Sequence, residues 1–132
     1  MERIEFIISE FQKCNIKLSQ DKADKLLKLY EFLVEYNKNV NLTAITDFEE
    51  VVVKHFIDSV LPFSMIDIKE NSSFIDVGTG AGFPSIPLMI VRPDLKGTLL
   101  EALNKRCVFL EKACELTEVD AKVIHGRAED YA

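Results

Sequence analysis

Three glycines follow a short apolar stretch in the middle of the chain, at positions 78, 80 and 82. Glycines allow a sharp turn and let a ligand approach the backbone closely. The dinucleotide fingerprint Gly-x-Gly-x-x-Gly would place its third glycine at position 83, where Phe83 stands instead. Asp76 lies two residues before the first glycine, and its carboxylate would repel a pyrophosphate but attract the ammonium group of a methionine moiety. The loop therefore favours a methionine-containing cofactor, and a tight turn without any ligand is the alternative.

Two further acidic segments follow apolar stretches that are typical of strands. Glu101 ends the second stretch, where an open parallel sheet places side chains at its ligand crevice. A carboxylate there can accept both ribose hydroxyls of an adenosine-containing cofactor, and the alternative is a solvated acid at a strand end. The segment Gly126–Asp130 follows the third stretch, so its backbone or Glu129 can meet the adenine. By itself, an acidic loop of this kind is usually only solvated.

Residues 73–132 alternate between short apolar stretches and segments with helical periodicity. The expected strands are 73–77, 97–101 and 121–125, and the expected helices run from Pro84 to just before Pro93 and over 104–115. An alternating order of strands and helices is typical of a parallel sheet with right-handed crossovers. The sequence therefore predicts an α/β domain over residues 73–132, with the glycine loop and Glu101 at one edge of its sheet.

Residues 1–66 carry only helical periodicity. Apolar residues recur at the i, i+3, i+4, i+7 spacing over about 2–14 and again over 19–38, where Ser19 can cap the helix. Because each helix has one apolar stripe, we expect this N-terminal helical segment to pack on the sheet. The mostly polar residues 67–72 are expected to link the two parts.

A third helix is expected after Asp47, which with Glu50 resembles a capping box. Proline lacks a backbone N–H, so we expect this helix to end at Pro62. His55 and Asp58 are i, i+3 neighbours on the helix and could pair. We favour a structural pair that fixes the helix against the sheet over an acid–base dyad.

The composition is that of an ordinary globular protein, with 48% hydrophobic and 29% charged residues. The net charge of −6 argues mildly against a nucleic-acid binder, although Lys105, Arg106 and Lys112 form a local basic cluster. The three cysteines show no metal-site spacing and are expected to be small buried thiols. No apolar run is long enough to span a bilayer, and the acidic N-terminus is unlike a secretory signal, so we expect a cytoplasmic protein with no membrane partner.

Five motifs occur in one order along the chain: Asn41–Ile45, His55–Ser59, Asp76–Pro84, Asn104–Arg106 and Gly126–Glu129. Together they resemble the GidB (RsmG) family of small-subunit ribosomal RNA methyltransferases. The resemblance implies a Rossmann-like class I methyltransferase sheet, S-adenosyl-L-methionine as cofactor, and methylation of guanine N7 in the 530 loop of 16S ribosomal RNA. It also implies cofactor contacts at Gly78, Phe83, Ala128 and Glu129, besides those expected at Asp76, Gly80 and Glu101. Ser85 stands where the family usually has glycine, and Glu101 where it usually has Asp.

Family members continue beyond the third strand, through the rest of a seven-stranded sheet and a further arginine that contacts the cofactor. The resemblance therefore implies that this chain, with 132 residues, is a shortened version with only the first three strands. Strand 73–77 would then have one hydrogen-bonding edge without a partner, although it is expected to be buried and apolar on both faces. Because an unpaired apolar edge invites association, we expect self-association through this edge.

Guanine N7 already has a lone pair, so no proton must be removed before it attacks a sulfonium methyl group. Catalysis can then depend on alignment and a dry site, and we assign no catalytic residue. Two alternative functions remain open from the sequence. One is an NAD-dependent Rossmann oxidoreductase, which the glycine spacing and Asp76 disfavour, and the other is a non-catalytic associating protein.

Overall fold

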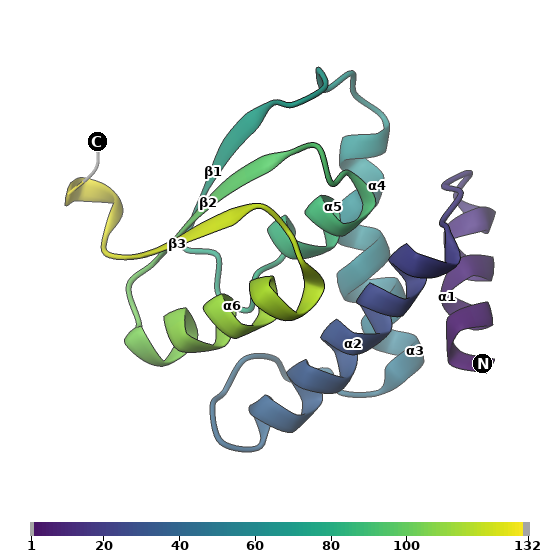
Figure 1. Cartoon of the computed structure of the whole chain (residues 1–132). Helices are drawn as coiled ribbons and strands as arrows, with labels where there is room; N and C mark the ends of the chain where they lie inside the picture. The colour runs from purple at the N-terminus through teal and green to yellow at the C-terminus, as the bar shows by residue number, and fades with distance from the viewer. Residues whose placement is uncertain (1, 131–132) are drawn as a thin grey trace.

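A computed structural model describes residues 2–130 of the chain. Its centre is a three-stranded parallel sheet in the order β1-β2-β3, and a helix connects each strand to the next (Figure 1). The elements of this half are β1 (Ser73–Val77), α5 (Ser85–Val91), β2 (Lys96–Glu101), α6 (Asn104–Thr117), β3 (Ala121–His125) and the 3₁₀ helix η2 (Ala128–Asp130). The expected α/β class and parallel sheet are confirmed.

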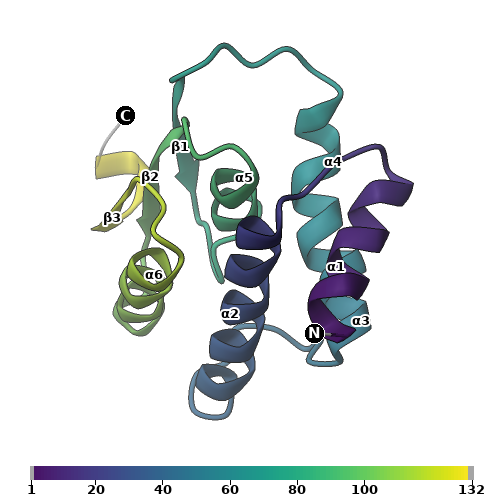
Figure 2. The ribbon, with the colours of Figure 1, turned by 45° about the vertical axis from the view of Figure 1, so that its right-hand side comes forward.

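The first half of the chain is helical. Its elements are α1 (Glu2–Lys13), α2 (Gln20–Asn37), α3 (Phe48–Glu50), the π-helix η1 (Val51–Ile57) and α4 (Asp58–Ser64). All the α-helices lie on the same side of the sheet: α5 and α6 are next to it, α2 packs across both, and α1 is farther out beside η1 (Figures 1 and 2). The sheet therefore has one covered face and one open face.

The hydrophobic core lies between the sheet and these helices. Leu99 of β2, Met89 of α5, Phe109 of α6, Leu33 of α2 and Phe56 of η1 are all fully buried in one cluster. Because this cluster takes side chains from both halves, the N-terminal helices bury their apolar stripes against the helices that cover the sheet. The core thereby fixes η1 relative to the turn that precedes α5.

The first two helices follow their apolar periodicity. Ile7 and Phe11 of α1 are fully buried, as are Ala23 and Leu26 of α2. Ser19 caps α2 as expected, because its hydroxyl oxygen accepts a hydrogen bond from the backbone N–H of Lys22 at 3.2 Å.

The third helical stretch begins as expected and ends differently. The Asp47 carboxylate accepts a hydrogen bond from the N–H of Glu50 at 3.2 Å, but the Glu50 carboxylate pairs with Lys54 instead of returning to the cap. The expectation that the helix ends at Pro62 was wrong, because α4 continues to Ser64. Pro62 lies on the exposed side of the last turns, where the missing N–H costs only one hydrogen bond near a helix end.

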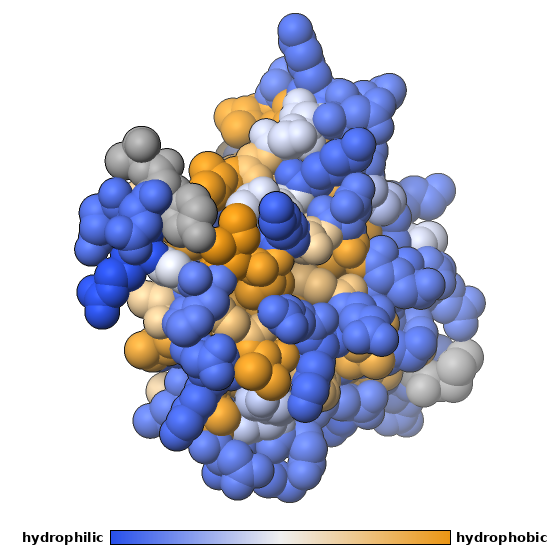
Figure 3. Space-filling model, turned by 60° about the vertical axis from the view of Figure 1, so that its left-hand side comes forward, coloured by the Kyte–Doolittle hydropathy of each residue, from blue (hydrophilic) through white to orange (hydrophobic). Residues whose placement is uncertain are grey.

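Strand β1 is not buried on both faces, which corrects the expectation from its apolar sequence. The side chains of Ile75 and Val77 are 58% and 54% exposed. The register places Ile75 beside Thr98 and Val77 beside Leu100, on the face of the sheet that no helix covers. Figure 3, which brings the left-hand side of Figure 1 forward, shows hydrophobic side chains uncovered across the middle of the view.

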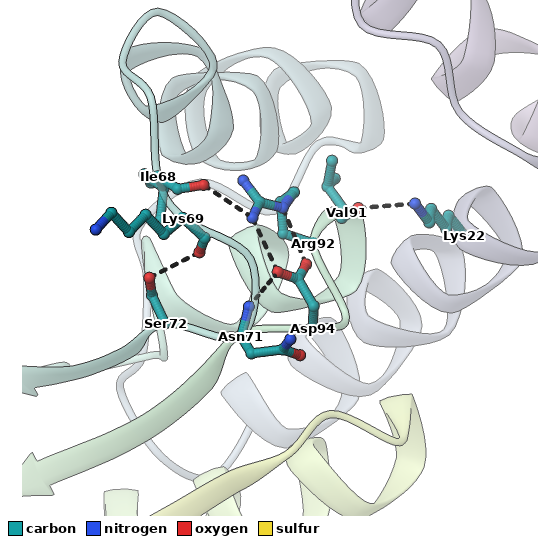
Figure 4. A network of polar contacts seen from close by, with 8 residues as sticks. All are labelled: Lys22, Ile68, Lys69, Asn71, Ser72, Val91, Arg92 and Asp94. Carbon is teal, nitrogen blue, oxygen red and sulfur yellow. Dashed lines mark hydrogen bonds and ion pairs between the residues drawn. The ribbon is translucent and has the colours of Figure 1, made fainter.

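A polar network joins the linker to the turn after α5 (Figure 4). The Arg92 guanidinium donates two hydrogen bonds of 2.9 Å to the Asp94 carboxylate and one of 3.2 Å to the carbonyl of Ile68. The backbone N–H of Asn71 also donates to Asp94, at 2.9 Å. The hydrogen bonds from Arg92 and Asn71 hold the pKa of Asp94 well below its usual range. The network thus stabilises the end of the sheet opposite the glycine turn.

All three cysteines are free thiols. Cys107 and Cys114 are buried as expected, whereas Cys14 is only half-buried, which corrects the expectation for that residue. Burial raises the pKa of Cys107 and raises the pKa of Cys114 to about 12, so both thiols stay protonated at neutral pH. Over residues 2–130, no helix is long and apolar enough to cross a membrane. The same part of the chain holds no group of three or more His, Cys, Asp or Glu side chains that could bind a metal ion.

Candidate functional site

The glycine turn begins directly after β1, and its three glycines have two different structural roles. Gly78, Gly80 and Gly82 have φ angles of 68°, 61° and 88°, a left-handed region that favours glycine. A Cβ atom at Gly78 or Gly80 would have nothing within 4 Å, whereas a Cβ at Gly82 would lie 2.5 Å from Cδ1 of Ile86. The first two glycines therefore leave the backbone open to a ligand, and the third allows close packing against α5.

Asp76 holds the two ends of this turn together. Its Oδ2 accepts a hydrogen bond from Oγ of Thr79 at 2.9 Å and another from Oγ of Ser85. Both hydroxyl residues are buried, so the sequence reasoning missed two partners of this carboxylate. Their signal was the spacing, with hydroxyls three and nine positions after an acid that ends a strand. Because both hydrogen bonds go to Oδ2, the second carboxylate oxygen, Oδ1, remains able to pair with a cationic group.

Glu101 is a buried carboxylate at the carboxyl end of β2, with only 4% of its surface exposed. Its Oε1 accepts a hydrogen bond from the N–H of Gly80 at 3.0 Å, and its Oε2 accepts one from the N–H of Leu103 at 2.9 Å. This geometry excludes the solvated acid that the sequence left open. Each oxygen keeps a second lone pair, so the carboxylate can still accept a hydrogen bond from a hydroxyl group.

The segment after β3 lies at the same edge of the sheet. His125 pairs with Glu101 in the parallel register, and the N–H of Gly126 donates to the carbonyl of Glu101 at 3.0 Å. Ala128 and Glu129 follow on the 3₁₀ helix η2 and are exposed. The structure therefore gathers Asp76, Gly78, Gly80 and Glu101 around one turn, with Ala128 and Glu129 on the neighbouring segment.

Phe83 is the one expected cofactor residue that faces the helical half of the chain. Its ring stacks on the ring of His55, with centroids 4.7 Å apart and planes 11° apart. Nε2 of His55 lies 2.8 Å from Oγ1 of Thr43, so Thr43 rather than Asp58 is its hydrogen-bond partner. Burial lowers the pKa of His55, and the charge of the exposed Asp58 acts weakly in the opposite direction. The sequence reasoning did not identify this cluster, because its members come from three separate motifs.

The basic cluster is divided by the structure. Lys105 and Arg106 lie in the first turn of α6, directly after Leu103, whose N–H is bonded to Glu101. Lys112 lies two turns farther along, with its ammonium group 5.8 Å from the centroid of the Tyr36 ring. Only the first two residues are therefore close to the glycine turn.

The described geometry is a carboxylate-flanked turn at the edge of a parallel sheet, with an open backbone. A family model described as rRNA small subunit methyltransferase G, GidB, matches residues 22–132. The chain belongs to this family. The match begins in α2 and includes the glycine turn, Glu101 and the segment after β3.

Curated relatives agree with this membership. The ribosomal RNA small subunit methyltransferase G of Staphylococcus epidermidis (strain ATCC 12228 / FDA PCI 1200) is 46% identical over 129 residues, which are 97% of this chain and 54% of the relative. The protein of the same name from Staphylococcus haemolyticus is 43% identical over 99% of this chain and 55% of its own length. The protein of that name from Clostridium kluyveri is 41% identical over 100% of this chain and 56% of its own length. The chain thus spans about half the length of the curated relatives it matches.

Proposed function

We propose that this chain carries the cofactor-binding part of an S-adenosyl-L-methionine-dependent methyltransferase. The observation that carries the proposal is the open backbone at Gly78 and Gly80, which lies beside the carboxylates of Asp76 and Glu101. A backbone without Cβ atoms lets a ligand approach closely, and the two carboxylates suit one cationic group and one pair of hydroxyl groups.

The residues fit S-adenosyl-L-methionine in the following way. Asp76 binds the ammonium group of the methionine moiety through Oδ1, and Glu101 accepts hydrogen bonds from the ribose hydroxyls. Ala128 and Glu129 contact the adenine, and Phe83 borders the cofactor from the helical side. When bound, the cofactor would supply a methyl group on a sulfonium sulfur, and the neutral thioether S-adenosylhomocysteine would be the leaving group.

The proposed substrate is N7 of a guanine in the 530 loop of 16S ribosomal RNA. Support comes from the names of the relatives, which are ribosomal RNA small subunit methyltransferases. Because N7 already has a lone pair, the protein needs to align the base with the methyl group and exclude water. The partner is then the small ribosomal subunit or its RNA, which makes the cytoplasm the proposed location.

A further proposal concerns association of two copies through β1. One edge of β1 has no strand beside it in the β1-β2-β3 order, and Ile75 and Val77 are exposed on the open face. A cleft of about 270 Å³ runs along the same edge. It is lined mainly by apolar residues, among them Phe63 and Leu88, together with the polar residues Asp76 and Ser85. A second copy would supply partners for the backbone groups of the edge and cover these side chains.

Isothermal titration calorimetry with S-adenosylhomocysteine and with NAD tests the proposed activity. We expect S-adenosylhomocysteine to bind and NAD to give no heat, because a pyrophosphate would approach the Asp76 carboxylate. Binding of NAD alone would instead support the oxidoreductase. If neither compound bound, the chain would be a non-catalytic associating protein and the methyltransferase proposal would be rejected.

A further inference from the structure

The contact between His55 and Phe83 joins the helical half of the chain to the glycine turn. Phe83 follows directly on Gly82, so the position of its ring fixes the last residues of the turn. The two rings are nearly parallel, with centroids 4.7 Å apart, which is a favourable stacking distance. Phe56, one residue after His55, also contacts the Phe83 ring, with centroids 6.1 Å apart and planes tilted by 59°.

His55 is itself held in place by a second set of contacts. Its Nε2 lies 2.8 Å from Oγ1 of Thr43, and the same oxygen accepts a hydrogen bond from the N–H of Ile45 at 3.1 Å. Asn37, the last residue of α2, accepts hydrogen bonds from the N–H groups of Leu42 and Thr43 and donates one to the carbonyl of Thr43. The His55 ring is therefore fixed from α2 through this loop.

The backbone at His55 is unusual. It lies in η1, a π-helical stretch of 7 residues with a wider turn than an α-helix. Stretches of this kind are rare and occur frequently at functional sites. In η1 the wider turn carries the residue that stacks on Phe83.

We propose that His55 is a positioning residue: through its stack on Phe83 it holds the glycine turn in the conformation that receives the cofactor. Asn37 and Thr43 fix the His55 ring relative to α2, and the ring fixes the glycine turn through its stack on Phe83. The consequence for affinity rests on the proposed cofactor site, whereas the effect on the turn itself needs no ligand.

Amide hydrogen exchange measured by NMR tests the effect on the turn. The N–H groups of Gly80 and Gly82 are hydrogen-bonded to Glu101 and Thr79, so they report the opening of the turn. An aromatic pair contributes enough to change such an equilibrium by about two- to tenfold. We expect His55→Gln, which keeps a polar group but removes the ring, to speed exchange at these two amides by that factor.

Two further variants separate stacking from hydrogen bonding. His55→Phe keeps the stacking ring but loses the contact of Nε2 with Thr43, so we expect it to restore only part of the protection of the turn. Phe83→Leu removes the stack from the other side and should open the turn as His55→Gln does. Lys54→Gln changes an exposed neighbour on the same π-helix and is the matched control, for which no change at Gly80 is expected.

The amides of β2 in the core distinguish positioning from general destabilisation. If His55→Gln speeds exchange at Leu99 as much as at Gly80, the residue has only a structural role and the inference is overturned. Unchanged exchange at both places overturns it as well. The expected pattern is faster exchange confined to the turn, together with a two- to tenfold weaker affinity for S-adenosylhomocysteine. Failure of the wild-type protein to bind that compound would reject the proposed function but leave the exchange result to decide this inference.

Discussion

Glu101 combines two tasks that are usually separate at a ligand site. Its carboxylate is almost completely buried, and its charge is met by the N–H groups of Gly80 and Leu103. A buried carboxylate is tolerated only when hydrogen bonds replace its lost hydration. In this position it fixes the glycine turn and the start of α6 and also presents acceptor lone pairs at the proposed site. Asp76 acts similarly through Thr79 and Ser85.

The first prediction concerns Glu101→Ala. We expect binding of S-adenosylhomocysteine to weaken by about 1.5–3 kcal/mol, the range for hydrogen bonds to a charged group. The free energy of unfolding should also fall, by about 1–3 kcal/mol, because two backbone N–H groups lose their acceptor. Calorimetry and urea unfolding measure the two effects, with Glu115→Ala on the exposed side of α6 as the control. An unchanged dissociation constant would remove Glu101 from the cofactor site.

The second prediction contrasts two glycines of the same turn. Gly80→Val should abolish cofactor binding, because a branched side chain would fill the open space beside the backbone and is also strained at the φ angle of 61° that the turn requires. Gly82→Ala should mainly destabilise the fold, by about 1–3 kcal/mol, because its Cβ collides with Ile86 and overpacks the core. Titration and thermal unfolding of both variants give the comparison. Wild-type affinity in Gly80→Val would contradict the assignment of the loop.

At the scale of elements, the carboxyl and amino ends of the sheet have different roles. The carboxyl end carries the glycine turn, Glu101 and the segment after β3, whereas the amino end carries the network of Arg92, Asp94 and Asn71. Parallel strands bring all their carboxyl ends to one edge, which is why ligand groups collect there. The network at the other edge stabilises the linker between α4 and β1 without contacting the site.

The third prediction is a pH dependence of stability from Asp94. The folded pKa of Asp94 lies below its ordinary value of 3.8, so its contribution is fully present above that value and is lost as the pH falls below it. We expect Asp94→Asn to lower the free energy of unfolding by about 1–2 kcal/mol at pH 7, and the difference from wild type to shrink between pH 5 and pH 3. Urea unfolding at several pH values measures this difference, and Glu115→Gln on the exposed side of α6, away from this network, is the control. A difference independent of pH would contradict the assigned cause.

The fourth prediction concerns the first turn of α6. Lys105 and Arg106 lie beside the proposed site and could contact phosphates of the RNA, although a solvated helix start is the equal alternative. If they bind phosphates, replacing both with Glu should weaken RNA binding and flatten the slope of log K against log salt by about 1–2. Lys112→Glu, on the same helix but over the Tyr36 ring, should leave the slope unchanged. If the double variant has the same salt slope as wild type, Lys105 and Arg106 do not contact phosphates and are only solvated surface residues.

At the scale of the whole molecule, the helices cover only one face of the sheet (Figures 1 and 2). Parallel sheets in proteins normally have both faces covered, because their strands are apolar on both sides. Here Val77, Leu100 and Ile124 follow one another across this face, and exposure is greatest at the β1 edge: Val77 is 54% exposed and Ile124 is half-buried, whereas Leu100 between them is only 2% exposed. The open face and the free edge of β1 are thus the surfaces where this chain can gain most from a partner.

The fifth prediction follows from this surface. We expect the chain to sediment as a dimer or larger species, because a second copy would cover this face and pair with the edge of β1. Ile75→Lys should favour the monomer, because it places a charge on the open face. Ile75 is 58% exposed, so the substitution leaves the core intact. Met65→Lys is the matched control. Met65 follows α4 rather than lying on the sheet, and it is 74% exposed. Strictly monomeric protein at high concentration would reject self-association.

Most of the helices and strands, and most of the proposed site, could be predicted from the sequence. Helical periodicity located α1 and α2, Ser19 marked a cap, and the order of strands and helices predicted the parallel sheet. These features depend on local hydrogen bonding and on side-chain spacing, which can be read along the chain. The glycine turn with Asp76 and the position of Glu101 at a strand end were visible for the same reason.

Which side chains meet and which faces stay open depends on the packing of the complete chain and could not be predicted from local patterns. The stack of Phe83 on His55, the hydroxyl partners of Asp76 and the burial of Glu101 all join residues that are separate in sequence. The exposure of Ile75 could not be predicted from an apolar strand, because it depends on which side the connecting helices take. Local patterns specify what an element can bury, and the packing of the whole chain determines what it does bury.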